Sequence, residues 1–208
     1  MSEDVVTKWN GRYSAEGAQW QASPPRDLLL SFVDRLPARG LVLDAAAGVG
    51  VNGLVLARRG LHVVCLDVSE VGLRLAREQA RRENLWLETA VYDLSHPWFP
   101  PDCFDVILNF RFLERATFPM YRRALKPGGW LLFETFIRTA ETHTDVDFYL
   151  LPGELTAAFA DFEVLHDEEI SRVNGRSGQP KSTAQLVARK PSDLGLEIAN
   201  LQSPLPNP

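Results

Sequence analysis

The fold is decided by the stretch Leu41-Val-Leu-Asp-Ala-Ala-Ala-Gly-Val-Gly50. It begins as a buried strand that ends at Asp44, and the residues after it have little or no side chain. Gly48 and Gly50 permit positive φ angles and a close approach of the backbone to a ligand. A helix over Asn52–Arg59 is expected next, with free N–H groups and a positive dipole at its start. A strand, a loop of small residues and a helix in this order favour a parallel α/β unit whose loop binds a ligand.

The spacing of the small residues separates two kinds of ligand loop. Dinucleotide enzymes use G-x-G-x-x-G and place the pyrophosphate on the helix N-terminus. Here the order is Asp44-x-Ala46-x-Gly48-x-Gly50. A carboxylate at the strand end would repel a pyrophosphate and could attract the amino group of an amino-acid-like ligand. The order argues against an NAD-dependent dehydrogenase, although a tight turn without a ligand also fits this segment alone.

Length and composition indicate a single soluble domain. The chain has 208 residues and a net charge of -5, so it has no overall basic field for a nucleic acid. Its arginine pairs fall late in predicted helices, where they favour the negative end of the dipole. The two cysteines lack metal-ligand spacing, so no metal site is expected. Without a signal segment or an apolar run of membrane length, we expect a cytoplasmic protein that binds neither membrane nor nucleic acid.

A second acid ends the next predicted strand. His62–Asp67 reads as a buried strand, and Ser69 can cap the helix that follows and runs to about Glu83. Asp67 lies 23 residues beyond Asp44. An acid at this place in a βαβ unit can accept both hydroxyls of a ribose, whereas the alternative is a capping or loop carboxylate.

The later strands complete an open sheet. A third strand, Leu85–Ala90, leads to Asp93, and Asn109-Phe110-Arg111-Phe112 follows the fourth strand at the edge where such sheets bind ligands. The remaining predicted elements are the fourth strand Phe104–Leu108, a helix Phe118–Leu125, a turn Lys126–Gly129, a fifth strand Trp130–Phe136, a loop Ile137–Leu151, a helix Glu154–Phe159, a sixth strand Phe162–Asp167, a basic hairpin loop Ser171–Lys181 and a last strand Thr183–Ala188. The final hairpin predicts an antiparallel end to the sheet. We expect an N-terminal lid segment (1–23), one domain (24–190) and a loosely attached tail (191–208).

Two motifs connect the chain to a known family. The unit Leu125-Lys-Pro-Gly-Gly-Trp-Leu131 and the loop that starts at Asp44 resemble class I S-adenosylmethionine (SAM)-dependent methyltransferases. Within that class the chain looks most like the tellurite-resistance, or TehB-like, branch. The matching segments are Trp9, Arg12 and Tyr13, then Leu43–Asn52, Asn109–Leu113, Phe133–Phe136, Leu150–Leu155 and Val187–Lys190. Ala46 departs from the first Gly of the usual motif, and Val49 and Val51 replace polar residues common in that branch.

The resemblance implies a fold and a cofactor. It implies a Rossmann-like, doubly wound α/β fold with a mostly parallel seven-stranded sheet of order 3-2-1-4-5-7-6, an antiparallel last strand and helices on both faces. SAM would lie across the ends of strands one, two and four, with Asp44 near its amino group, Asp67 on the ribose, and Asp93 and Leu94 on the adenine. The full set of cofactor-binding candidates is Arg12, Tyr13, Asp44, Ala46, Gly48, Gly50, Asn52, Asp67, Val68, Asp93, Leu94, Asn109 and Phe110.

A methyl acceptor can be predicted only by chemical class. A soft nucleophile on a small molecule, such as a thiol or a selenium or tellurium oxyanion, needs no strong general base, and the four scattered histidines offer no obvious one. Arg111, Arg172 and Arg176 are the candidate catalytic residues, and Arg138 and Lys181 could help them bind an anion. Open alternatives are an O- or N-methyltransferase of a metabolite and a SAM-binding regulator without transfer activity. The Asp/Asn-Pro-Pro-Tyr/Phe motif of nucleobase methylation is absent. We expect a monomer or a homodimer.

Overall fold

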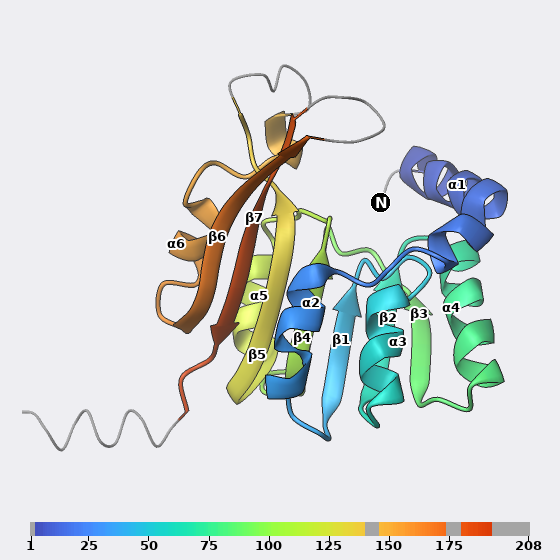
Figure 1. Cartoon of the computed structure of the whole chain (residues 1–208), viewed down its shortest axis with the longest axis horizontal. Coiled ribbons are helices and arrows are strands. Elements are labelled where there is room, and N and C mark those ends of the chain that lie inside the picture. Colours follow the sequence, from blue (N-terminus) through green and yellow to red (C-terminus); the bar gives the residue numbers. More distant parts are fainter. Residues whose placement is uncertain (1–2, 140–145, 174–179, 193–208) are drawn as a thin grey trace, which may run out of the picture.

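One mixed β-sheet forms the middle layer of the molecule (Figure 1). The computed structural model describes residues 3–139, 146–173 and 180–192. The sheet has the strand order β3-β2-β1-β4-β5-β7-β6, and β7 runs antiparallel to both neighbours. The strands are β1 (Leu41–Ala45), β2 (His62–Asp67), β3 (Leu87–Val91), β4 (Phe104–Phe110), β5 (Leu125–Phe136), β6 (Glu163–Val173) and β7 (Pro180–Arg189). The predicted fold class, strand order and antiparallel last strand are confirmed.

Helices cover both faces of the sheet and create two apolar cores. On one face, α2, α3 and α4 pack residues such as Leu29 and Leu56 against Val106 of β4. On the other, α5 and α6 pack Tyr121 and Phe159 against the sheet. The helices are α1 (Glu3–Gln21), α2 (Asp27–Phe32), α3 (Val51–Arg58), α4 (Glu70–Arg82), α5 (Thr117–Ala124) and α6 (Glu154–Ala158), with short 3-10 helices η1 (Val33–Arg35) and η2 (Val146–Phe148). None of the described helices is long and apolar enough to cross a bilayer.

The central strands are apolar on both sides because both of their faces are covered. In β4, Val106 and Leu108 enter the core beneath α2 and α3, while Ile107 between them enters the opposite core. All three side chains have no exposed surface. This alternation is the pattern expected of a parallel strand buried between two helix layers.

The predicted turn at Lys126–Gly129 is a bulge within β5. Leu125 already pairs with Phe104, and the register then shifts before Trp130 pairs with Val106. The extra residues leave the ladder at Gly128, whose φ is +77°. The separate turn was therefore wrong: a Pro-Gly-Gly sequence can be accommodated within a strand when the extra residues bulge out of the ladder.

The C-terminal hairpin is longer than predicted. β6 runs on to Val173, and its pairing with β7 continues to Val173 opposite Pro180. The acidic run in β6 breaks the apolar alternation, but a strand at the sheet edge tolerates exposed polar residues. The basic loop is thus shorter than Ser171–Lys181, and Arg176 lies outside the described residues.

Helix α1 was not predicted from the sequence. Its outer face is polar, and only Tyr13 and Gly17 are buried, so no apolar stripe marks it. The helix rests on α4 (Figure 1), where Asn10 Oδ1 accepts hydrogen bonds from Ser69 Oγ at 2.7 Å and from the Val71 N–H at 3.3 Å. A tertiary contact with the start of α4, rather than amphipathicity, therefore holds α1 in place.

The contact between α3 and α4 depends on Gly50. Gly50 has φ +73°, and an added Cβ would lie 2.7 Å from the Cβ of Ala76. Gly60 also has a positive φ, +92°, but has nothing within 4 Å of its would-be Cβ. We expect Gly60→Ala to lower the free energy of unfolding by about 1 kcal/mol through backbone strain, and Gly50→Ala by about 3 kcal/mol through strain and overpacking together. Urea denaturation of both variants would measure the difference, and equal losses would contradict a rigid contact.

Candidate active site

The candidate site lies where β1, β2 and β4 end together. These strands pair in parallel, with Asp44 opposite Cys65 of β2 and Ala45 opposite Asn109 of β4. β2 and β3 are added on one side of β1, and the chain then crosses back to add β4 on the other side, so the sheet order reverses here. Open α/β sheets bind ligands in the crevice at such a switch point.

The loop after β1 has an unusual backbone. Ala46, Gly48 and Gly50 all have positive φ, at +53°, +57° and +73°. Glycine adopts this conformation freely, while alanine pays about 1 kcal/mol for it. Ala46 is therefore a strained residue at the position where the resembling family usually has glycine, and strain of this kind concentrates at functional sites.

Asp67 joins this loop to the end of β2. Its Oδ2 accepts the Gly48 N–H at 2.8 Å and its Oδ1 accepts the Ser69 N–H at 2.8 Å. Only 7% of the residue is exposed. Burial raises the pKa of Asp67, while the N–H groups of Ser69, Gly48 and Val68 act in the opposite direction. The half-buried Val68 follows the carboxylate directly.

Asp44 points toward the first turn of α3. Its Oδ2 accepts the Gly53 N–H at 2.8 Å, so it satisfies one free donor of the helix start. The side chain is buried, and burial raises the pKa of Asp44 to about 7, with the nearby charge of Asp67 adding to the effect. The carboxylate is held within the protein and has little surface of its own to offer a ligand.

Tyr13 of α1 covers the loop, and Arg12 does not. A Cβ added to Gly48 would lie 2.5 Å from the Tyr13 hydroxyl. Burial raises the pKa of Tyr13, and the Asp67 carboxylate raises it further. Arg12 is exposed, with its guanidinium 5.3 Å from the ring centroid of Trp9. Of the two residues predicted to close over the site, only Tyr13 reaches it.

The segment after β3 contributes a fixed acid. Asp93 Oδ1 accepts the Ser95 N–H at 2.9 Å and the Ser95 hydroxyl at 2.7 Å. Leu94 is buried in the core beside Phe99. The side chain of Asp93 is half-buried, so part of it faces solvent beyond the end of β3.

The amides of Asn52 and Asn109 are used inside the protein. Asn52 Oδ1 accepts the Arg26 N–H at 3.0 Å. Asn109 Nδ2 donates to the Phe112 carbonyl at 2.8 Å, and its Oδ1 accepts the Tyr121 hydroxyl at 3.0 Å. The side chain of Phe110 is buried in the core. At positions 109 and 110 it is thus the backbone that can face a ligand.

A buried polar network follows β4 and β5. Arg111 has φ +60°, its Nε donates to Glu134 Oε1 at 2.8 Å, and its guanidinium lies 4.8 Å from the ring centroid of Phe136. Glu134 is only 4% exposed, and its Oε2 accepts Gln185 Nε2 at 2.7 Å. Sequence reasoning missed Glu134 and Gln185. A lone acid in the predicted apolar strand Trp130–Phe136 was the available signal, because buried acids are rarely unpaired.

A second arginine fixes the segment before α6. Arg115 pairs with both carboxylate oxygens of Glu154, at 2.6 and 2.9 Å, and donates to the carbonyls of Asp147 and Tyr149. This bidentate pair was also missed, although both residues stand in or beside segments singled out in the sequence. Arg138 is exposed and follows β5. The other predicted basic residues, Arg172 and Lys181, stand opposite each other in the backbone register of β6 and β7.

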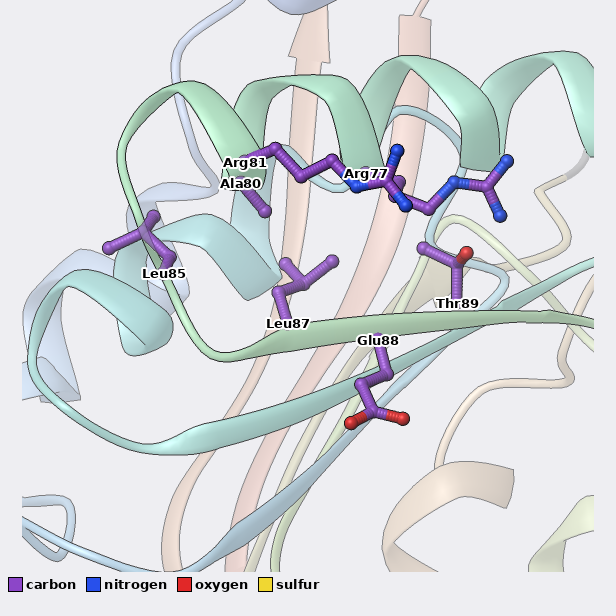
Figure 2. A pocket seen from close by; sticks show the side chains of 7 residues that line it. All are labelled: Arg77, Ala80, Arg81, Leu85, Leu87, Glu88 and Thr89. Atoms are coloured by element: carbon purple, nitrogen blue, oxygen red, sulfur yellow. The ribbon is translucent and has the colours of Figure 1, made fainter.

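A surface cavity of about 270 Å³ lies away from this site. It opens between α4 and the edge strand β3, where Arg81 extends above Leu87, Arg77 extends above Thr89, and Glu88 points to the opposite side of the strand (Figure 2). The lining residues are Arg77, Ala80, Arg81, Leu85, Leu87, Glu88 and Thr89. None is a predicted site residue. Within the described ranges, no cluster of three or more histidine, cysteine or acidic side chains could hold a metal ion.

Comparison with known proteins shows which proteins the chain is similar to. Residues 42–129 match a family model described as a methyltransferase domain. A ubiquinone biosynthesis O-methyltransferase of Hahella chejuensis is 29% identical over 151 residues, 67% of this chain and 61% of that protein. The probable thiol methyltransferase 2 of Arabidopsis thaliana is 26% identical over 142 residues, 64% of this chain and 62% of that protein. The crystal structure of TehB from Haemophilus influenzae has a TM-score of 0.68 at 23% identity, covering 79% of this chain and 61% of that one.

These matches support the class. The chain spans about three fifths of the length of both curated relatives. At 23% identity, the likeness to TehB shows the fold alone, so the TehB-like branch stays a prediction. The strand order, the strained loop after β1, the match of residues 42–129 to a methyltransferase domain and the named relatives together support a class I SAM-dependent methyltransferase.

Proposed function

We propose that this protein binds SAM across the carboxyl ends of β1, β2 and β4 and transfers its methyl group to a small-molecule acceptor. The observation that carries the proposal is the pair of buried acids Asp44 and Asp67 at the ends of adjacent strands, joined by a positive-φ loop. A buried acid is unfavourable unless something compensates its charge. The ammonium and ribose hydroxyls of SAM would provide such compensation.

The geometry supports a role for each part of the cofactor site. The Asp67 carboxylate accepts the Gly48 N–H on one oxygen and the Ser69 N–H on the other, and the Val68 N–H lies beside it; since a carboxylate has about four acceptor sites, it retains capacity for a ribose hydroxyl. Asp93 and the backbone of Leu94 would meet the adenine, next to Val68. Asp44 would act on the ammonium group through water or the intervening backbone. The remaining predicted contacts are with Ala46, Gly48, Gly50, Asn52, Asn109 and Phe110.

Helix α1 would act as a lid. Tyr13 lies on Gly48 and interacts with Asp67, so the ribose can reach that carboxylate only if Tyr13 moves aside. We infer that residues 1–23 open and close over the cofactor, with Arg12 brought closer on closure. Residues 24–190 would form the catalytic domain and 191–208 a tail.

The chemistry suits a soft nucleophile. Bound SAM supplies a methyl group already activated on a sulfonium sulfur. A lone pair of the acceptor would form the new bond to the methyl carbon, while the old bond breaks and its electron pair stays on the sulfur of S-adenosylhomocysteine. The protein then needs to align the acceptor and exclude water. A thiolate or a selenium or tellurium oxyanion needs no base for this step.

The described histidines contact other side chains of the protein. His62 stacks on Trp86 beside the outer strand, with ring centroids 4.4 Å apart. His96 is exposed, and His166 lies 3.3 Å from Gln185. The relative named as a thiol methyltransferase supports a sulfur acceptor, whereas the relative named as an O-methyltransferase favours the second candidate, methylation of a hydroxyl. A SAM-binding regulator without transfer activity is the third.

Cofactor binding can be tested by calorimetric titration with SAM, S-adenosylhomocysteine and NAD. We expect the first two to bind and NAD not to bind. Asp67→Asn, which keeps the shape and loses the charge, should weaken binding about 10- to 100-fold, because two charge-assisted hydrogen bonds to the ribose would be lost.

Asp105→Asn is the matched control. Asp105 Oδ2 also accepts a backbone N–H, that of Leu41 at 2.8 Å, but at the opposite end of the sheet. Its substitution should leave cofactor binding unchanged. Failure of the unmodified protein to bind either ligand would sink the proposed function.

Asp44 should make stability depend on pH. Its pKa is about 7 in the folded protein against 3.8 as the ordinary value, so the folded state holds a proton that the unfolded state has lost between these values. The contribution of Asp44 to the free energy of unfolding is therefore largest at low pH and falls as the pH rises toward 7. Asp44→Asn lacks this loss. The free energy of unfolding of Asp44→Asn, relative to that of the native protein, should therefore increase by about 2 kcal/mol between pH 5 and pH 8.

Denaturation curves of the two ligand-free proteins at both pH values would measure this change. Other titrating groups, Asp67 included, are common to both proteins and largely cancel in the difference. A constant difference across the range would mean that Asp44 ionises normally. The same variant should bind SAM more weakly at pH 8, because the negative charge that attracts the ammonium is gone.

The acceptor class can be tested by measuring S-adenosylhomocysteine release. We expect release with small thiols, selenite or tellurite, and much slower release with catechols and amines of similar size. Faster reaction with catechols would favour the hydroxyl-directed alternative. Binding of SAM without release in the presence of any of these compounds would favour the regulator.

A further inference from the structure

Two arginines flank the acceptor side of the proposed site. Arg26 starts α2, and Arg111 follows β4. Burial lowers the pKa of Arg26, and the charge of Arg111 lowers it further, while Glu134 and the exposed Asp27 oppose the shift. Arg111 contacts the buried Glu134 carboxylate at 2.8 Å, and Arg26 lies within electrostatic range of both groups.

Arg111 is held rigidly with part of its hydrogen-bonding capacity unused. Its main-chain N–H donates to the Glu134 carbonyl at 2.7 Å, its Nε donates to the Glu134 carboxylate, and its guanidinium lies over Phe136. Among the described residues, nothing bonds its two terminal nitrogens. Its left-handed backbone, φ +60°, adds strain to this arrangement. Strain and a buried ion pair together present a guanidinium edge in a fixed orientation.

Arg26 is placed but not neutralised. Its main-chain N–H is held by Asn52 Oδ1, which ties it to the first turn of α3. Its half-buried guanidinium forms no hydrogen bond or ion pair with any residue in the described part of the chain. Glu134 cannot serve both arginines fully, because its oxygens already accept Arg111 and Gln185. A partly desolvated cation without a partner is unfavourable, and a bound anion would offset that cost.

The position of the pair separates the acceptor from the cofactor. Asp67 and Asp93 follow β2 and β3, on one side of β1, and would hold the adenosine. Arg111 and Glu134 belong to β4 and β5, on the other side. The methyl group of a cofactor laid across this edge would point toward β4 and β5, so the arginine pair faces the entering nucleophile.

We propose that Arg26 and Arg111 together bind an anionic group of the methyl acceptor, a carboxylate or an oxyanion, and so select anionic acceptors over neutral or cationic ones with the same nucleophile. This inference rests on the proposed function. The planar guanidinium fork matches the two oxygens of such a group, which a lysine could not do in the same way.

The test compares three thiols that differ in charge: 3-mercaptopropionate, 2-mercaptoethanol and cysteamine. Each is titrated into the protein saturated with S-adenosylhomocysteine, and binding is followed by ligand-observed NMR. We expect the anionic thiol to bind the unmodified protein at least tenfold more tightly than the other two, since a charge-assisted contact contributes about that factor. Arg26→Gln should remove this preference and leave S-adenosylhomocysteine affinity unchanged within about twofold.

Two further variants serve as controls for the Arg26→Gln result. Arg39→Gln makes the same chemical change at an exposed residue before β1, at the opposite end of the sheet, and should keep the preference. Arg111→Lys keeps the charge and the link to Glu134, and should reduce the preference without abolishing it, because the fork is lost. Circular dichroism and thermal unfolding confirm that each variant is folded.

Different results would overturn this inference and the proposed function. Equal binding of the three thiols by the unmodified protein would overturn the inference. So would a loss of S-adenosylhomocysteine affinity in Arg26→Gln with unchanged binding of 5′-methylthioadenosine, since the arginines would then hold the cofactor's carboxylate. If S-adenosylhomocysteine does not bind at all, the proposed function fails. The same titrations on the ligand-free protein then decide whether the arginine pair is an anion site.

Discussion

The Asp67 carboxylate is the interaction on which the site depends. One oxygen holds the Gly48 N–H of the loop after β1, and the other holds the Ser69 N–H at the start of α4. Ser69 Oγ in turn donates to Asn10 of α1. A single buried acid thus links two loops, a helix start and the helix above them, so changing it would disturb the loop, the helix start and the contact with α1 together.

This arrangement is energetically unfavourable, and apolar burial in other parts of the fold offsets its cost. Asp44 and Asp67 place two carboxylates in a buried region, and the charge of Asp67 makes ionisation of Asp44 harder. Ala46 adds a left-handed backbone that alanine adopts reluctantly. The two large apolar cores on the sheet faces can offset these terms, because the central strands are buried completely. Unfavourable features gathered at one edge of an otherwise regular sheet are typical of a functional site.

Sequence patterns predicted the regular parts of this fold well. The second strand, His62–Asp67, has the predicted bounds, because its apolar run, end acid and following cap all agree. The strand order came from the family resemblance rather than from periodicity. Helix α1 was missed because a contact with α4 stabilises it, and the bulge in β5 was missed because Pro-Gly-Gly usually ends an element. Both depend on tertiary structure that a local pattern does not contain.

The candidate site divides in the same way. Asp44, Gly48 and Asp67 could be selected from the sequence, because each stands at a strand end or in a small-residue loop, and the fold brings them together. The hydrogen-bond partners of the other candidate side chains were not predictable. Asn52 and Asn109 form hydrogen bonds within the protein, and the contacts of Glu134 with Arg111 and Gln185 join the end of β4 to residues of β5 and β7. Pairing over such sequence separations follows from the register of the sheet.

The same register places acidic and basic side chains on opposite sides of the point where the strand order reverses. Acids end β1 and β2, whereas Arg111 follows β4 and Arg26 begins the helix beside it. A cofactor with a cationic sulfonium and an ammonium group would be favoured on the acidic side, and an anionic acceptor on the basic side. The attraction between the sulfonium and an anionic nucleophile would then act along the line on which the methyl group moves. In that view the sheet edge orients both reactants by their charge, and alignment takes the place of a catalytic base.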